Sequence, residues 1–471
     1  MKSVTRIEKD SMGEMEVPAG AYYGAQTMRA VRNFPISSYR FPRRFILALG
    51  LIKRAAAEVN LELGLLEPTV AGAIVQAAQE VVDGKLDDQF VVDIFQTGSG
   101  TSTNMNTNEV IGNRAIEIVG GKIGSKNPIH PNDHVNRGQS SNDVIPTAIH
   151  LAGLLTMRDE LVPALSMLRD ALYVKSREFM PVIKTGRTHL QDATPIRLGQ
   201  EFLGYAGQMD RGLQRLKAAQ AELSEVALGG TAVGTGINTH PEFARRVCEK
   251  LSVMTGLRIR ESDNHFQAQS TIDAVVAAHG ALNTLAASLM KIANDLRWLG
   301  SGPRAGIGEL ALPEVQPGSS IMPGKVNPVI AEALTMVCAE VMGNHTTVTV
   351  AGMSGNFELN VMMPIAAYKL LQSISLMAAA SRNFTEKLVV GLQATERGPE
   401  MVEKGLAIAT ALAPAVGYDA TAAISKEAFK TGGTVREVAR ARSGLTEEQL
   451  DRLLNPEAMT EPGFSGAESG G

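Results

Sequence analysis

The chain has 471 residues, 44% of them hydrophobic, with 45 Lys+Arg against 49 Asp+Glu. This length can bury a large core and allows two or three domains, while the balanced charge indicates neither a nucleic-acid partner nor an acidic tail. Aromatic residues make up 4% and there are two cysteines, so stacking platforms for bases, a disulfide framework and a cysteine zinc site are unsupported, and a reducing cytosol fits.

The N-terminal residues 1–20 are mixed and charged, without the apolar run of a signal peptide. No stretch of the chain reaches the roughly 18 uninterrupted apolar residues of a membrane span. We therefore expect a cytoplasmic protein with no membrane partner and no nucleic-acid partner.

Long runs without proline predict long helices, because proline deletes an amide donor and clashes with the preceding turn. Within 151–172 and 272–296, Leu, Ile and Val recur at helical spacing, and apolar residues spread beyond one stripe. Helices of this kind are buried on several sides, which predicts the core of a bundle that other subunits extend. The proline-free runs are 196–240, 242–302, 329–363 and 365–398.

The helical runs are separated by polar or Gly-rich segments at 96–108, 130–143, 185–192, 229–240 and 301–328. There is no βαβ alternation, and short alternating stretches such as TTVTV at 346–350 are too few for a sheet domain. We predict an all-α, mainly helical chain whose last residues, GFSGAESGG, form a frayed tail. The predicted parts are a loop-rich helical domain over 1–138, a central long-helix bundle over 139–395 and a small helical domain over 396–471.

Three polar segments concentrate hydroxyl and amide groups ahead of or between helices. QTGSGTSTNMNTNE at 96–109 is compatible with a ligand site, since glycine lets the backbone approach closely, but a capping or turn role fits better. QSSND at 139–143 is either a helix N-cap or an anion site, and one helix N-terminus can be both. GRTHLQD at 186–192 places Thr188 beside His189, where a structural and a catalytic histidine are equally consistent.

The segment GSSIMPGKVNP at 318–328 combines mobility with reactive side chains. It presents the hydroxyl of Ser319, the amide of Asn327 and the ammonium of Lys325, which can supply a point charge for a carboxylate. Its last proline opens a helix that contains Glu332. We predict that this loop carries the chemistry.

Standard cofactor and metal motifs are absent from the sequence. GKV at 324–326 fails as a phosphate loop, because five residues separate the glycines and Val326 replaces the required Ser or Thr. GGTAVGTG at 229–236 does not spell GxGxxG. There is no HExxH, and the eight histidines form no obvious metal set. We expect catalysis without a metal ion or a tightly held cofactor.

GSSIMPGKVNP matches the signature of the aspartase/fumarase superfamily without a change. The chain resembles that superfamily along nearly its whole length, and it is most similar to class II fumarases. The resemblance implies a three-domain helical subunit whose central bundle assembles into a homotetramer with a twenty-helix core, and active sites built from three subunits. The segments that carry it are EKDSMGEMEVPAGAYYGAQT, HPND, QSSND, GRTHLQDATP, LGGTAVGTGINTHPEF, NDLRWLGSGPR, SGPRAGIGEL and SGNFELNV.

The resemblance also implies an activity, the reversible hydration of fumarate to L-malate in the citric acid cycle. Ser319 is then the base that takes the C3 proton of malate, and preorganised donors stabilise the charge that develops. His189, paired with Glu332, acts on the water side, and Lys325 is the fourth catalytic residue. The implied substrate-binding residues are Ser99, Thr101, Ser140, Ser141, Asn142, Thr188, Lys325 and Asn327. A second, non-catalytic anion site is implied at His130, Asn132 and Asp133.

Other functions stay open at this point. Aspartate ammonia-lyase has the same fold and base, and both His134 and the ending NPEAMTEPGFSG resemble aspartases. A catalytically silent structural homologue, like the lens crystallins of the superfamily, is argued against by the presence of Ser319, His189 and Lys325. Argininosuccinate and adenylosuccinate lyases are weaker alternatives because their substrates are bulkier.

Overall fold

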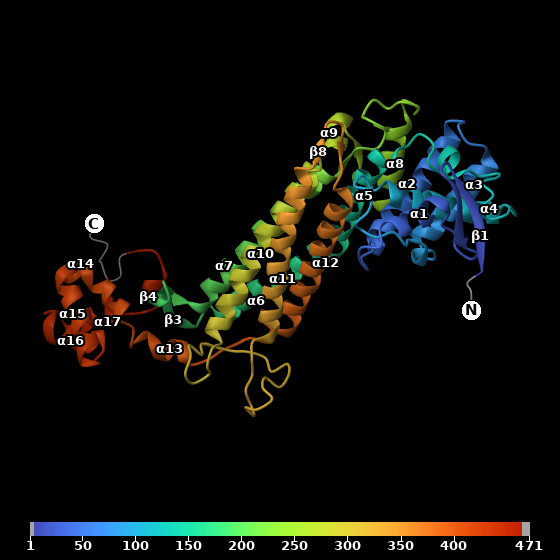
Figure 1. Cartoon of the computed structure of the whole chain (residues 1–471). Coiled ribbons are helices and arrows are strands. Elements are labelled where there is room, and N and C mark those ends of the chain that lie inside the picture. The colour runs from blue at the N-terminus through green and yellow to red at the C-terminus, as the bar shows by residue number, and fades with distance from the viewer. Residues whose placement is uncertain (1–3, 464–471) are drawn as a thin grey trace. The chain divides into compact units, whose positions relative to one another are not determined.

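The computed structural model of the chain describes residues 4–463, and the predicted tail beyond Gly463 lies outside the described residues. Within them the chain forms seventeen α-helices and ten short strands, and the strands pair only two by two (Figure 1). The prediction of a mainly helical fold without a sheet domain is therefore confirmed.

The chain divides into two compact units, each with a hydrophobic core of its own. In the first unit, the helices over Arg43–Glu62, Pro68–Val82 and Thr101–Ile118 build a core. In the second unit, residues 406–459 build a smaller one. The first unit consists of Met1–Pro163, Gly212–Ala286 and Val337–Ala379, and the second of Ala164–Arg211, Ala287–Met336 and Ala380–Gly471. The division into three domains at residues 138 and 395 stays a prediction.

The first unit opens with an antiparallel hairpin of β1 (Thr5–Asp10) and β2 (Gly13–Pro18). Pro68 occupies the first turn of α3, where its missing amide is not needed. The helices of this unit outside the long ones are α1 (Ala25–Asn33), α2 (Arg43–Glu62), α3 (Pro68–Val82), α4 (Thr101–Ile118), α5 (Ser141–Thr156), α8 (Phe243–Thr255) and α9 (His265–Ser270). Two strand pairs complete it: β5 (Glu225–Val226) with β6 (Arg260–Glu261), and β8 (Gly355–Asn356) with β9 (Leu359–Asn360).

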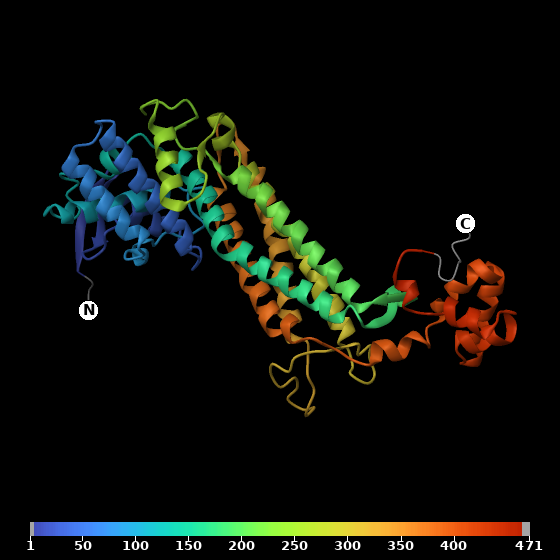
Figure 2. The same ribbon diagram turned by 180° about the vertical axis from the view of Figure 1, so that it is seen from behind.

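Four long helices lie on the predicted proline-free runs, with α12 beginning two residues early: α7 (Leu198–Leu223), α10 (Asp273–Leu299), α11 (Val329–Gly352) and α12 (Met363–Lys387). A fifth, α6 (Val162–Phe179), covers the second half of the apolar run 151–172, whose first half lies in α5 and a short π turn. Figure 2 shows α10, α11 and α12 from behind, and Ser373 of α12 accepts hydrogen bonds from Asn344 of α11 at 3.1 Å and contacts His279 of α10 at 2.9 Å. The run 242–302 is broken after α8 at Gly256, whose φ of +68° ends that helix.

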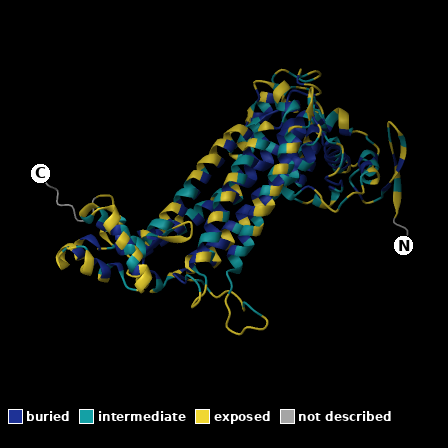
Figure 3. Ribbon diagram, turned by 60° about the vertical axis from the view of Figure 1, so that its left-hand side comes forward, coloured by how far each residue is buried: buried dark blue, intermediate teal, exposed yellow. Residues whose placement is uncertain are grey.

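The long helices expose one side in the single chain. Buried and exposed residues alternate along them (Figure 3), and the exposed ones include the large apolar side chains of Leu203, Met336 and Val350. Among the described residues, α10 alone is long and apolar enough to cross a membrane by length and composition. Its Asp295 accepts a hydrogen bond from Tyr205 of α7 at 3.0 Å, a contact typical of a core helix in a bundle.

The second unit carries the hairpin of β3 (Ile183–Thr188) and β4 (Gln191–Arg197), and β7 (Leu310–Ala311) pairs with β10 (Gln393–Ala394). Threonine-led capping boxes begin two of its small helices, with Glu437 and Gln449 closing the reciprocal hydrogen bonds. These small helices are α13 (Arg397–Val402), α14 (Ala413–Val416), α15 (Tyr418–Thr431), α16 (Val435–Arg442) and α17 (Glu447–Leu453). Short 3-10 or π turns lie at Asp87–Gln89, Pro131–Val135, Met157–Leu161, Val389–Gly391, Leu406–Leu412 and Ala458–Thr460.

Local structure departs from expectation at two places. The polar segment 96–108 contains the first two turns of α4, and the segment 185–192 forms a hairpin, whereas TTVTV at 346–350 lies inside α11, within the predicted helical run 329–363. In α4 the polar residues are compatible with a helix because their side chains bond to other segments. Asn106 donates to the Gln89 carbonyl oxygen at 2.9 Å, and Asn113 donates to that of Tyr22 at 2.8 Å, so these side chains do not compete with the helix backbone.

Candidate active site

The first group of predicted binding residues lies at the N-terminus of α4. The hydroxyls of Ser99 and Thr101 are 2.7 Å apart, with Ser99 buried. Gly100 has a φ of +74°, and a Cβ on Gly98 would lie 1.8 Å from the carbonyl oxygen of Val361. Glycine is therefore required at both positions, and it brings the two hydroxyls to a helix end with free backbone amides.

The second group lies at the N-terminus of α5. Ser140 is the N-cap and accepts from the amide of Asn142 at 3.2 Å, while Asp143 accepts from the amide of Ser140 at 2.9 Å. This reciprocal pair is a capping box. Ser141 accepts at its Oγ from the side-chain amide of Asn104 at 3.2 Å. The N-cap interpretation is thus correct, and it leaves the anion-site interpretation intact because the helix dipole also favours negative charge there.

Asp143 joins the α5 N-terminus to the Gly-rich segment that follows α7. Its second carboxylate oxygen accepts from the amides of Gly229 and Thr231, both at 3.0 Å, and Asn142 donates to the carbonyl oxygen of Ala232 at 2.8 Å. Burial raises the pKa of Asp143 to about 6, and the backbone hydrogen bonds act in the opposite direction. The three amides hold the carboxylate in one orientation.

The residues predicted as a second anion site lie together at the start of the π-helical turn Pro131–Val135. The Nδ1 atom of His130 accepts from the amides of Asn132 at 3.2 Å and Asp133 at 3.3 Å. The carboxylate of Asp133 lies 3.4 Å from the same nitrogen and is exposed. His134 accepts from the backbone amide of His130 at 2.8 Å. His130 therefore acts as an N-cap here, and the anion-binding role stays a prediction.

His189 lies in the two-residue turn between β3 and β4. Both turn residues have positive φ, +58° for His189 and +61° for Leu190, as a type I′ turn requires. Such a conformation is unfavourable for side chains with a Cβ, and strain of this kind is often found at functional sites. Thr188 and His189 are exposed, so both are accessible to a ligand.

A buried ion-pair network anchors the base of this hairpin. Arg187 binds Glu309 through two hydrogen bonds of 2.6 and 3.1 Å. The buried Lys184 lies 3.1 Å from Glu309 and 2.7 Å from Glu201. Bidentate charged pairs restrict geometry strongly. The strand residues next to the His189 turn are therefore held in place by Glu309.

The loop 318–328 presents Ser319 with two donors. The Oγ of Ser319 accepts from the amides of Ile321 at 3.2 Å and Met322 at 3.0 Å. Both donors favour negative charge on that oxygen. Lys325 is exposed, and Asn327 donates to the carbonyl oxygen of Gly318. The two loop amides would therefore provide part of the stabilisation that an alkoxide at Ser319 requires.

Within one chain the predicted residues form separate groups. In the described residues, no hydrogen bond or ion pair joins Thr188 or His189 to the loop or to Glu332, which lies half-buried in the first turn of α11. The His189–Glu332 pairing stays a prediction. Over the same residues, no set of three or more His, Cys, Asp or Glu side chains is arranged to hold a metal ion.

Known proteins match the chain over almost its full length. A family described as Lyase matches residues 13–343, and the Fumarase C C-terminus family matches residues 408–461. The chain is 54% identical to fumarate hydratase class II 2 of Bradyrhizobium diazoefficiens, over 98% of each chain. It is 55% identical to the mitochondrial fumarate hydratase of Rattus norvegicus, over 97% of this chain and 90% of that one. The chain belongs to the class II fumarate hydratase family.

The structural comparison agrees with the membership in the fumarate hydratase family. The crystal structure of recombinant class II fumarase from Schistosoma mansoni superposes with a TM-score of 0.95 at 41% identity, covering 97% of this chain and 99% of that one. The predicted superfamily, fold and lyase class are confirmed. The relatives do not favour the aspartase alternative.

Two residues next to the predicted fumarate hydratase site were missed by sequence reasoning. Asp143 could have been found, because Ser140 and Asp143 have the spacing of a capping box. Lys53 carries no such signal, since its segment KRAAAE reads as an ordinary exposed helix turn. The structure buries it completely.

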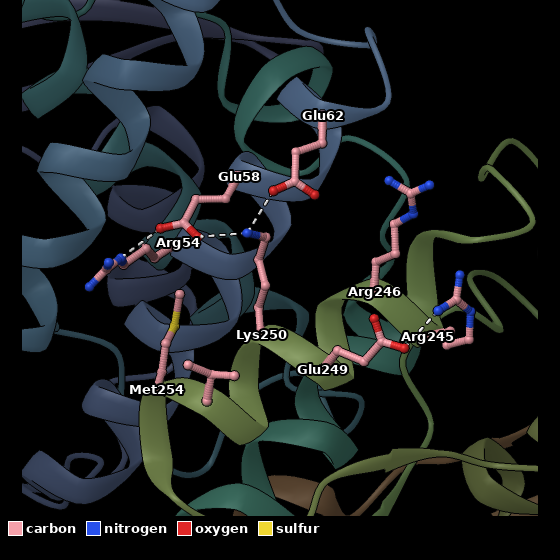
Figure 4. Close-up of a pocket in the computed structure, with 9 residues that line it drawn as sticks. Arg54, Glu58, Glu62, Arg245, Arg246, Glu249, Lys250 and Met254 are labelled. Carbon is pink, nitrogen blue, oxygen red and sulfur yellow. Dashed lines mark hydrogen bonds and ion pairs between the residues drawn. The ribbon is translucent and has the colours of Figure 1, made fainter.

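A pocket of about 580 Å³ lies between α2 and α8, and none of the predicted fumarate hydratase residues lines it (Figure 4). Its charged side chains neutralise one another. Lys250 binds Glu62 at 2.7 Å and Glu58 at 3.3 Å, and Arg54 binds Glu58 at 2.9 Å. This pairing leaves the pocket with little attraction for a charged ligand.

Proposed function

We propose that the chain is a fumarate hydratase that catalyses the reversible anti addition of water to fumarate, giving L-malate. The observation that carries the proposal is the pair of backbone amides directed at the Oγ of Ser319, in a chain about 54% identical to curated fumarate hydratases. A serine hydroxyl is a poor base in water, and donors of this kind make its alkoxide accessible.

In the direction of malate dehydration, the Oγ of Ser319 takes the C3 proton. The electron pair left on C3 spreads onto the adjacent carboxylate, whose charge Lys325 and the remaining amide hydrogen of Asn327 would stabilise. The pair held on C3 and its carboxylate then forms the C2–C3 double bond of fumarate as the C2–O bond breaks. The hydroxyl takes the electron pair of that C2–O bond and leaves as water after it is protonated. His189, with Glu332, would deliver the proton that the leaving hydroxyl needs.

Neutral donors in the other segments would hold the two carboxylates of the substrate. The α5 N-terminus offers the Ser140, Ser141 and Asn142 side chains at the positive end of the helix dipole, and the α4 N-terminus offers Ser99 and Thr101. Thr188 would add a hydroxyl from the hairpin. His130, Asn132 and Asp133 are proposed as a separate, non-catalytic anion site.

We also propose a homotetramer in which three subunits build each active site. Support comes from the apolar side chains that the long helices expose in the single chain, since such faces favour association. In this proposal the three domains are 1–138, 139–395 and 396–471, and the enzyme acts in the cytoplasm, in the citric acid cycle, without a metal ion or cofactor.

A substrate assay separates fumarate hydratase from aspartate ammonia-lyase. L-malate and L-aspartate are supplied separately, and fumarate is followed by its ultraviolet absorbance. We expect fumarate from L-malate alone, with the rate unchanged by a chelator. Fumarate from L-aspartate alone would establish the ammonia-lyase instead, and binding of fumarate without turnover would indicate a silent homologue.

A complementation experiment tests the shared site. Ser319→Ala and His189→Asn are each expected to lose activity, and Asn is well suited to the positive φ of residue 189. If the two residues reach one site from different subunits, reassembled mixtures of the variants regain activity. Activity that stays at the level of the separate variants would mean that both residues come from one subunit.

A further inference from the structure

Lys53 is a fully buried lysine in the middle of α2. Its Nζ donates to the side-chain oxygens of Asn136 at 2.9 Å and Gln139 at 3.0 Å. Both of these partners are neutral amide oxygens, and in the described part of the chain Lys53 forms no ion pair with a carboxylate. Burial lowers the pKa of Lys53 to about 7, against the attraction of Asp143. An apolar side chain would fill this position without the cost of desolvating an amine.

The partners of Lys53 lead directly to the predicted anion site. Asn136 accepts from Lys53 and also from the side-chain amide of Asn104 at 3.2 Å, and the same amide of Asn104 donates to the Oγ of Ser141. Asn136 in turn donates to the backbone carbonyl oxygen of Gln139 at 3.1 Å. Lys53 is therefore connected, through the side chains of Asn136 and Asn104, to the hydroxyl of Ser141, a predicted binding residue.

The other side of the same helix end is held by Asp143, through the amides of Gly229 and Thr231. The α5 N-terminus is thus fixed from two sides, by a buried acid in its first turn and by a buried base on α2. Lysine suits its place because an ammonium has three donors and no acceptor. It can satisfy two amide oxygens at once, and unlike a glutamine amide it brings no acceptor oxygen that would itself need a partner in the buried site.

We infer that Lys53 is a positioning residue for substrate binding. Through Asn136 and Gln139 it holds the N-terminal turn of α5 and the Ser141 hydroxyl in the geometry that receives a carboxylate of the four-carbon substrate. In its protonated form Lys53 also places a positive charge near that helix N-terminus, which favours a dianion. The inference rests on the proposed function, because it takes the α5 N-terminus as the binding site of the substrate.

The test replaces Lys53 by methionine, which keeps the length of the side chain and removes its charge and donors. We expect the KM for L-malate to rise about tenfold or more, with a smaller change in kcat, because the interaction acts on binding. The affinity for succinate, a saturated four-carbon dicarboxylate, is measured by calorimetry and should fall in parallel.

Lys175→Met is the matched control. Lys175 is also buried, but it binds Glu178 at 2.8 Å and the carbonyl oxygen of Leu392 at 2.7 Å, and it touches no predicted site residue. Its loss should lower thermal stability and leave KM and succinate affinity unchanged. The inference is overturned if Lys53→Met also loses only stability.

If Lys53→Met does not fold, Gln139→Leu tests the positioning role of Lys53 instead. It removes one acceptor of the ammonium at a half-buried position, and we expect the same loss of succinate affinity. Wild-type affinity in this variant would contradict the inference. Because succinate binding is measured without turnover, an inactive wild-type chain would refute the proposed function while the role of Lys53 is still read from calorimetry.

Discussion

The α5 N-terminus and the loop 318–328 are both predicted to touch substrate, yet the protein holds them in opposite ways. At the α5 N-terminus, Asp143 uses both carboxylate oxygens and Lys53 satisfies two side-chain amides. The loop is mostly exposed, and the hydrogen bonds of Ser319 and Asn327 stay within it.

We expect this difference to separate substrate binding from catalysis. Donors that are fixed before the substrate arrives cost no ordering entropy on binding, so they suit recognition of the carboxylates. A loop with few outside contacts has low local stability and can close over a substrate. We expect substitutions at the α5 N-terminus to act mainly on KM, and substitutions in the loop to act mainly on kcat.

The largest expected effect is that of Ser319→Ala. Loss of the base should lower kcat by roughly three orders of magnitude and leave the assembly and KM nearly unchanged. Steady-state kinetics and size-exclusion chromatography measure both. Ser320→Ala, which removes the neighbouring exposed hydroxyl, is the control and should keep most activity. Near-normal turnover by Ser319→Ala would remove Ser319 as the base and end the contrast between the two regions.

Asp143→Asn breaks the fixed region. One acceptor becomes a donor facing backbone amides, so we expect a loss of about 1–3 kcal/mol in the free energy of unfolding and a higher KM. Urea unfolding and steady-state kinetics measure the two effects. Asp93→Asn is the control, because Asp93 is also buried and accepts from Ser37 but is not a predicted site residue. A KM change of equal size in both variants would contradict a local role for Asp143.

The smallest expected effect is that of Gly324→Ala in the loop. Gly324 has a φ of +78° with open space around it, and so has Gly120 after α4, with a φ of +77°. Alanine at either position should cost about 1 kcal/mol of backbone strain. Only Gly324→Ala should lower kcat, by less than tenfold, because only this variant introduces backbone strain into the loop 318–328. Equal kinetics for the two variants would mean that the loop conformation does not limit turnover.

Local sequence patterns predicted the helices well because their causes are local. The absence of proline and the recurrence of apolar residues, as in 272–296, depend only on neighbours along the chain, and α10 follows them. The turn at His189 escaped prediction, because a positive φ at histidine is imposed by the pairing of β3 with β4. The helical state of 101–108 escaped it too, since its polar side chains find partners far along the chain.

By itself, the sequence determined the mainly helical fold and the family, and it predicted the residues that would carry the chemistry. The unbroken GSSIMPGKVNP segment is specific enough to identify a superfamily without any contact. Only the tertiary structure decided how Lys53 and Asp143 hold the α5 N-terminus, and that two amides face the Ser319 oxygen. Lys53 and Gln139 are far apart along the chain, and lysine, which usually lies at the surface, becomes a desolvated donor when tertiary packing buries it. The sequence around Lys53 contains no local pattern that predicts this burial.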